Sequence, residues 1–396
     1  MAAGRHAGPD AGLGADPRRH NGRRRRLPGG AHHALFEASY DVALYVVLVL
    51  GLITTFLSVF MGLVMTDIKQ VIAYSTLNSL GLMMVALGFG EAGVAPAMLY
   101  LFCHAFFKAL LFLGSGSVIH ATEKQDVSEL GGLAKKMPIT NATFAIGALS
   151  MAGLVPLSGF FAKDEIMVVA QDYGIIPLIL LAVTLPITAM YMLRVYLLTF
   201  MGEPKDHHAY EHAHESPPIM AVPLLILAAL AVVAGFIVFD AAGEAIGMGS
   251  GFLGAVEQAL VPDLHEFHFD WPLAIVSTLL VGGGLAGALY AFSGAAEPAK
   301  KAAAAFPFFY ALFRNKFYLD DFYQWVINNL VLGFARVIAF FDRAVVNDTG
   351  INGTGQVTYG FGWLLKFHQT GQLPNYALGM VLGVAIIAIV GFSVKG

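Results

Sequence analysis

Long apolar runs recur along most of this chain of 396 residues, and they restrict its fold more than any other feature. A helix needs about 20 apolar residues to cross the hydrocarbon layer of a bilayer. Predominantly apolar runs of about that size occupy residues 42–65, 68–89, 94–120, 175–201, 219–239, 272–292 and 376–392. Only 13% of the residues are charged, against roughly a quarter in soluble domains. The sequence therefore predicts a membrane protein and excludes a water-soluble globule.

An eighth apolar run begins at residue 139 and is interrupted by Pro156 and Gly159, after which Lys163, Asp164 and Glu165 follow. Irregular backbone is tolerated inside a membrane only where it faces protein or water. We therefore expect a discontinuous helix here. The alternative is that the span ends at Gly159 and the three charges lie in an interfacial loop. The predicted fold is an all-α, polytopic bundle of about eight transmembrane helices, one of them discontinuous.

Residues 294–374 mix apolar side chains with Asp, Asn and Arg, which favours amphipathic helices on the membrane surface or against partner subunits. We divide the chain into four parts: residues 1–33, 34–293 (the transmembrane domain), 294–374 and 375–396 (a terminal span).

The basic residues of the loops lie on one side of the membrane in the predicted topology. If the eight spans alternate, the loops at 66–69, 121–138, 202–216 and 294–374 share one side, and the loops at 90–93, 172–174 and 240–271 share the other. The first set contains Lys69, Lys124, Lys135, Lys136, Lys205, Lys300, Lys301, Arg314, Lys316, Arg336, Arg343 and Lys366, and the second contains no Lys or Arg. By the positive-inside rule the first set is cytoplasmic and the C-terminus is periplasmic.

Ionisable residues inside membrane spans are costly and point to function. Lys108 lies near the middle of its span, and His104 precedes it by four residues, on the same helix face. A histidine titrates near neutral pH, and burial makes the charge of a lysine easier to lose, so the pair is suited to proton transfer. The alternative is a structural pair satisfied by neighbouring helices.

Other charged groups are weaker candidates. Lys163 and Asp164, with Glu165, are candidates for a relay at the helix break, whereas Asp67 and Lys69 form either a second pair or a solvated turn. Four histidines in a polar loop suggest adventitious metal binding or plain solvation, and we expect no functional metal; they are His207, His208, His212 and His214. The single cysteine, Cys103, excludes a disulfide within the chain and argues against an iron–sulfur or zinc–thiolate site in it.

Three sequence stretches resemble the antiporter-like membrane subunits of respiratory complex I. They are TDIKQVIAYSTLNSLG at 66–81, HAFFKALLFLGSG at 104–116 and GFFAKDEI at 159–166. Among the three paralogous subunits the distal subunit L fits best, because it ends with an extra surface helix and one further transmembrane helix, as residues 318–392 do. The resemblance runs from residue 34 to the end and corresponds to the last eight of the sixteen helices in that family.

The resemblance implies a proton-translocating membrane subunit of NADH:quinone oxidoreductase. It makes Lys108 the central proton-carrying lysine with His104 beside it, and Lys163 the lysine of the broken helix, next to Asp164. Tyr100 stands where some members carry another histidine. No cofactor is expected in this chain, since NADH, FMN, the iron–sulfur clusters and quinone belong to partner subunits. The implied partners are the M subunit and other membrane subunits, the lipid bilayer and protons, with no nucleic acid, in a bacterial inner membrane.

Two other functions remain open. One is the homologous subunit of a multi-subunit sodium/proton antiporter or a membrane-bound hydrogenase. The other is structural bracing of neighbouring subunits by a truncated and inert channel.

Residues 1–33 are rich in Arg, Gly and Pro and resemble no helix of that family. One choice of codons for residues 9–22, read from its second base, encodes PTPVSALIHAATMV, which resembles the broken-helix segment of the family. We therefore expect a frame error here and an N-terminally truncated product.

Overall fold

The computed structural model describes residues 33–238, 270–293, 296–367 and 369–395, so the N-terminal segment and nearly all of the loop predicted at 240–271 lie outside the described residues. The chain divides into two units, residues 1–310 and 311–396, each of which is described by itself. In the described ranges all regular structure is helical, which confirms the predicted fold class. The boundaries of the four predicted parts remain a prediction.

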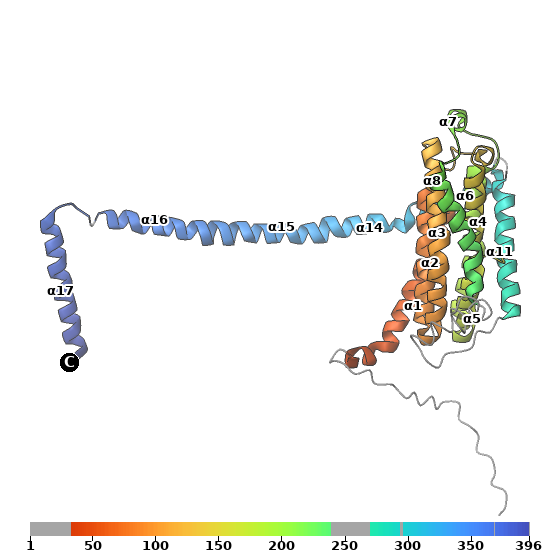
Figure 1. The fold of residues 1–396 in the computed structure, drawn as a ribbon. Coiled ribbons are helices and arrows are strands. Elements are labelled where there is room, and N and C mark those ends of the chain that lie inside the picture. The colour runs from red at the N-terminus through yellow and green to blue at the C-terminus, as the bar shows by residue number, and fades with distance from the viewer. Residues whose placement is uncertain (1–32, 239–269, 294–295, 368, 396) are drawn as a thin grey trace, which may run out of the picture. The chain divides into compact units, whose positions relative to one another are not determined.

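The first unit is a bundle of helices that run along a common direction (Figure 1). Its main helices are α1 (His33–Val64), α2 (Ile68–Gly88), α3 (Val94–Thr122), α4 (Pro138–Ala152), α5 (Ser158–Tyr173), α6 (Ile175–Phe200), α8 (Pro218–Val233) and α11 (Trp271–Phe292). Shorter elements are η1 (Gly90–Gly93), η2 (Leu133–Lys135), α7 (His207–His212), η3 (Ala234–Val238) and α12 (Glu297–Ala305). Six stretches of this unit are long and apolar enough to cross a membrane, at the predicted positions.

The interrupted eighth span is confirmed as two helices, α4 and α5. Neither half is long enough to cross a bilayer alone, and Gly153, with a φ of +88°, ends α4 in the left-handed conformation that glycine adopts readily. The two halves then pack very closely, since a Cβ atom on Gly159 would lie 1.9 Å from the carbonyl oxygen of Ser150. The charges after the break belong to helix α5 and are buried, so the interfacial-loop alternative is wrong.

Three of the loops predicted to share a side meet at one end of the bundle. Asp67 forms an isolated β-bridge with Asp126, and the N–H of Gly132 donates to the carbonyl of Met201. Lys124 lies 3.2 Å from Asp206, which caps α7, and α7 lies at one end of the bundle in Figure 1. These contacts join the loops at 66–69, 121–138 and 202–216.

Ion pairs of Lys124 with Glu129 and Asp206 contribute to the contacts at this end of the bundle. The pKa of Lys124 is raised by its hydrogen bonds to Glu129 and Asp206. The pKa of Asp206 is lowered by the N–H of Ala209 and by Lys124. Each group therefore holds its charge more firmly than it would in water.

At the opposite end, Gln171 at the end of α5 donates to Asp270, the residue that caps α11. The rings of Phe89 and Tyr173 pack with their centroids 4.8 Å apart. The chain thus alternates between the two ends as the basic-residue pattern predicts, over the loops that the structure describes.

The second unit contains a long helical rod, as the mixed pattern of 294–374 predicts (Figure 1). The elements of this unit are the end of α13 (Pro307–Arg314), then η4 (Lys316–Tyr318), α14 (Leu319–Val326), η5 (Ile327–Val331), α15 (Leu332–Phe341), η6 (Asp342–Asn352), α16 (Gly353–Lys366) and α17 (Leu373–Lys395). From residue 319 to residue 366 the helix is continuous, with η5 and η6 as π-helical turns, so the rod is roughly 70 Å long at about 1.5 Å per residue. None of the rod's residues is buried. The seventh stretch that could cross a membrane is α17.

Candidate functional site

Among the described residues, five Lys, His, Asp or Glu side chains are buried inside the bundle, and they come from two helices. His104 and Lys108 belong to α3, and Lys163, Asp164 and Glu165 belong to α5. Their exposed fractions lie between 3% and 9%. Because an isolated charge in a low-dielectric interior is very costly, each of these groups needs a partner or must be able to lose its charge.

Lys108 is held by helix α2. Its Nζ donates to the carbonyl oxygen of Ile72 at 3.1 Å and to the hydroxyl of Ser75. The hydroxyl of Ser75 in turn donates to the same carbonyl at 2.8 Å. The ammonium group thus lies against a polar site on α2, and this site supplies hydrogen-bond acceptors and no counter-ion.

Lys163 is held by the end of α4. Its Nζ donates to the carbonyl oxygens of Met151 at 2.6 Å and of Ala152 at 3.4 Å. These carbonyls belong to the last turn of α4, where the intrahelical partners are missing and the helix dipole is negative. The helix break thereby provides a cation-binding site whose acceptors are backbone carbonyls only.

Further buried polar contacts join α2 to α3 and to the end of α4. Ser79 lies one turn after Ser75 on α2 and contacts the sulfur of Met151 at 3.7 Å, while its hydroxyl reaches the carbonyl of Ser75 at 3.0 Å. The hydroxyl of the fully buried Tyr100 donates to Ser79 at 3.1 Å. Polar contacts therefore connect α2, which holds Lys108, with Met151 of α4, whose carbonyl holds Lys163.

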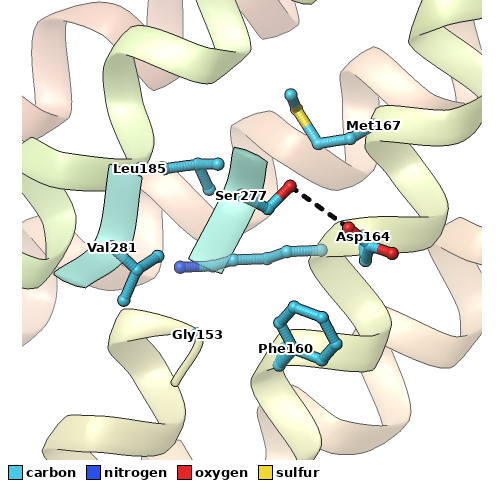
Figure 2. A pocket seen from close by; sticks show the side chains of 8 residues that line it. Gly153, Phe160, Asp164, Met167, Leu185, Ser277 and Val281 are labelled. Atoms are coloured by element: carbon cyan, nitrogen blue, oxygen red, sulfur yellow. Dashed lines mark hydrogen bonds between the residues drawn. The ribbon is translucent and has the colours of Figure 1, made fainter. Parts of the chain in front are cut away.

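Asp164 borders a small cavity between α5, α6 and α11. One carboxylate oxygen accepts a hydrogen bond from Ser277 at 3.2 Å, which Figure 2 shows, and the other has no partner among the described residues. Gly153, Phe160, Lys163, Met167, Leu185 and Val281 complete the lining. The cavity measures about 10 Å³, which is at the lower limit for one water molecule. Asp164 and Lys163 thus both border a space of about the size of one water molecule.

His104 lies on the same helix as Lys108 but in different surroundings. Its ring packs against those of Tyr100 and Phe107, with centroids 6.3 and 5.4 Å away, and its Nε2 has no partner among the described residues. His104 thus lies one turn from Lys108, with a buried ring nitrogen that makes no hydrogen bond among the described residues.

The other candidates do not join this buried group. Asp67 caps the start of α2 by accepting from the N–H of Gln70, and Lys69 is exposed, which agrees with the solvated-turn alternative. Arg194 of α6 is a further buried cation, and its guanidinium donates to the carbonyls of Leu63 and Met65 at the end of α1.

The four loop histidines are exposed. The rings of His208 and His212 lie 4.6 Å apart, but no group of three metal-ligating side chains occurs in the part of the chain that the structure describes.

Sequence reasoning missed the polar groups that hold the lysines. Ser75 and Ser79 were visible only as two serines at i and i+4 in an apolar run, a pattern that predicts one polar helix face. Backbone acceptors such as the carbonyl of Met151 leave no mark in the sequence at all.

The family described as NADH:quinone oxidoreductase/Mrp antiporter, transmembrane region, matches residues 31–188, which include both lysines. Subunit L of the NADH-quinone oxidoreductase of Neisseria meningitidis is 35% identical over 394 residues, which cover 89% of this chain and 56% of the relative. The chain belongs to the family of these antiporter-like L subunits. This confirms the resemblance drawn from the sequence.

Other relatives differ in the electron donor that their names give. Chain 5 of the NAD(P)H-quinone oxidoreductase of Picosynechococcus is 36% identical and covers 87% of this chain and 55% of the relative. Subunit L of the F(420)H(2) dehydrogenase of Methanosarcina mazei is also 36% identical, with 90% and 56% covered. The chain thus spans a little over half the length of the relatives it matches.

A solved structure of the Mrp complex from Dietzia matches with a TM-score of 0.49 and 20% identity, covering 61% of this chain and 50% of that one.

Proposed function

We propose that this chain is a proton-translocating membrane subunit of a quinone-reducing respiratory complex, with Lys108, His104, Lys163 and Asp164 as its proton-carrying groups. The observation that carries the proposal is that two buried lysines each donate to uncharged acceptors, on helices that further buried polar contacts connect. A structural role alone would be served as well by apolar side chains, which avoid the cost of burying charge.

The arrangement suits proton transfer by side chains and water. Each lysine binds its proton as an ammonium group held by uncharged acceptors, so losing the proton leaves no buried anion behind. The two like charges repel each other inside the bundle, and loading one lysine therefore favours release from the other. Asp164 and the small cavity give Lys163 a neighbouring acceptor and room for one water molecule.

The proposed setting follows from the family and from the charge pattern. The chain would lie in a bacterial inner membrane, with the basic loops on the cytoplasmic side and α17 leading to a periplasmic C-terminus. Other membrane subunits, including the M subunit, would be its neighbours, and the exposed rod would lie against them. Electrons would pass from donor to quinone through partner subunits only.

The electron donor itself is open to a second proposal. Because relatives named for F(420)H(2) and for NAD(P)H are equally similar to this chain, an F(420)H(2)-dependent complex is the alternative to an NADH-dependent one. Comparing NADH with reduced F(420) as donors for membranes that contain this chain separates the two.

The test replaces Lys108 and Lys163 by alanine, one at a time, in the complete membrane assembly that contains this chain. Proton uptake per electron is measured in inverted vesicles, and exposed Lys69→Ala is the control. We expect each buried-lysine variant to lose most of the pumping that depends on this chain, while the control retains it.

Normal assembly with unchanged pumping in both buried-lysine variants would reject the proposal in favour of a bracing role. Sodium-dependent proton exchange without quinone reduction would instead support the antiporter alternative.

A further inference from the structure

The first turn of α4 is capped by a side chain from a distant loop. Of the first four residues, Pro138 has no N–H, and the N–H of Asn141 reaches the carbonyl of Met137 at 2.8 Å. The two remaining N–H groups, those of Ile139 and Thr140, both donate to Oε2 of Glu215, at 2.6 and 3.3 Å. Glu215 therefore satisfies every N–H that this helix start leaves open.

The cap is reinforced by a side chain inside the bundle. The hydroxyl of Thr140, which is fully buried, donates to Oε1 of Glu215 at 2.6 Å, and the N–H of Ser216 donates to the same oxygen at 3.0 Å. The carboxylate thus accepts four hydrogen bonds at the positive end of a helix dipole, where a negative charge is stabilising.

The last turn of α4 is satisfied in the complementary way. The N–H groups of Gly153 and Leu154 donate to the carbonyl oxygens of Leu149 and Ser150. Of the last four carbonyls of α4, this leaves those of Met151 and Ala152 without a backbone donor. These two are the acceptors of Lys163. The carboxylate of Glu215 and the ammonium group of Lys163 thus satisfy the open backbone groups at the two ends of α4.

We propose that Glu215 is a positioning residue for Lys163, acting through α4. The helix has 15 residues, or roughly 22 Å at about 1.5 Å per residue, and it moves as one body because its hydrogen bonds are continuous. Fixing its start at Glu215 fixes the height of the carbonyls at its end, and with them the place of the Lys163 ammonium group. The inference deepens the proposed function, on which its activity measurement rests.

The surroundings of Glu215 and Lys163 are defined on each side. Beside Glu215 lie His214, whose Nδ1 is 3.1 Å from the Glu215 carbonyl, and Lys136, whose Nζ is 3.3 Å from the carbonyl of Glu211. Lys163 has Asp164 next to it on α5, and both border the cavity beside α11. Among the contacts that the structure describes, helix α4 is therefore the most direct connection between Glu215 and Lys163.

The direct test uses the full chain in lipid nanodiscs and does not depend on any activity. Glu215→Gln and Thr140→Val each remove part of the cap, while Thr140→Ser keeps the hydroxyl. Asp206→Asn is the matched control, since Asp206 caps α7 in the same loop and does not touch α4. In the first two variants we expect roughly tenfold faster hydrogen exchange at the first turn of α4.

The Lys163 side chain is followed in the same samples by ¹⁵N NMR of labelled lysine, with Lys163→Arg used to assign the Nζ signal. We expect this signal to move by more than its linewidth in Glu215→Gln and Thr140→Val, and to stay in place in Thr140→Ser and Asp206→Asn. Faster exchange at α4 with an unmoved Lys163 signal would overturn the proposal. If Glu215→Gln does not fold, Thr140→Val, which keeps the carboxylate, gives the same decision.

The activity measurement is proton uptake per electron in the complete assembly. We expect Glu215→Gln to lose at least half of the pumping that Lys163→Ala loses, and Thr140→Ser to retain it. Full pumping in Glu215→Gln together with a loss in Lys163→Ala would reject the positioning role. Full pumping in Lys163→Ala would reject the proposed function, while the NMR result would still decide whether Glu215 positions Lys163.

Discussion

The two buried lysines are held by two differently built regions. Around Lys108 the helices α2 and α3 are unbroken, and the ammonium group depends on one side chain, Ser75, and one carbonyl in mid-helix. Around Lys163 the helix is broken, and both acceptors are backbone carbonyls at the end of α4. A buried cation can thus be accommodated by a side chain on a regular helix or by an interruption of the helix itself.

The two solutions differ in what can disturb them. The first depends on the identity of one residue and tolerates small shifts of the backbone. The second has no side chain that could be removed, and depends instead on where α4 ends and how closely α5 approaches it. Mutations of each region should therefore fail in different ways.

The largest effect is expected at the helix break. Gly159→Ala places a methyl group 1.9 Å from the carbonyl oxygen of Ser150, which only a backbone shift can relieve, so we expect a loss of about 3 kcal/mol or more of stability. Gly116→Ala is the control, since nothing lies within 4 Å of its Cβ position. Thermal unfolding in detergent measures both. Equal melting temperatures would show that the break is less tightly packed than described.

The next effect concerns Lys108. Ser75→Ala leaves the ammonium group with the Ile72 carbonyl alone, at a cost of about 1–3 kcal/mol, so proton pumping should fall about tenfold without loss of folding. Ser75→Thr keeps the hydroxyl and should restore pumping. Ser115→Ala serves as the control, because that hydroxyl bonds only within its own helix, to Phe112. Unchanged pumping in Ser75→Ala would remove the distinction between the two regions.

A smaller effect is expected at Asp164. Ser277→Ala removes one hydrogen bond worth about 1 kcal/mol, and a water in the adjoining cavity can partly replace it. We expect pumping to fall about twofold. Thr278→Val, the neighbour on α11 whose hydroxyl bonds to Ala274, should leave it unchanged. A tenfold fall would mean that Asp164 is as dependent on one hydroxyl as Lys108 is.

The smallest effect is expected at the loop end, remote from both lysines. The pKa of Asp206 is lowered in the folded chain, so its contribution to stability is complete above the unfolded value of about 3.9 and is lost as the pH falls through the lowered one. Because the ion pair with Lys124 is partly exposed, the effect should be slight. Hydrogen exchange of α7, corrected for its intrinsic rate, should be steady from pH 5 to 8. A loss of protection within that range would contradict the assignment.

Much of this site followed from the sequence because its residues carry their own signal. Lysine in mid-span predicts a buried functional group, and proline and glycine followed by charges predict a broken helix. Lys108 and Lys163 were found in this way, and their burial is confirmed. Their roles in proton transfer remain predictions.

The rest depended on contacts between distant segments. That Asp67 caps a helix, that Arg194 binds the end of α1, and that Glu215 reaches the start of α4 are facts of packing, and each residue could equally have been solvated. Backbone acceptors are invisible to any pattern, because every residue has a carbonyl.

The exposed rod has a consequence for biosynthesis. Many of its large apolar side chains are more than half exposed, among them Phe322, Trp325, Phe334, Phe340 and Trp363. Such a surface remains uncovered from the time the ribosome releases the chain until another surface meets it, and exposed apolar surface is what chaperones and proteases recognise. The cellular level of this subunit should therefore follow the supply of whatever covers the rod, and a cell that makes the subunit in excess should degrade the surplus.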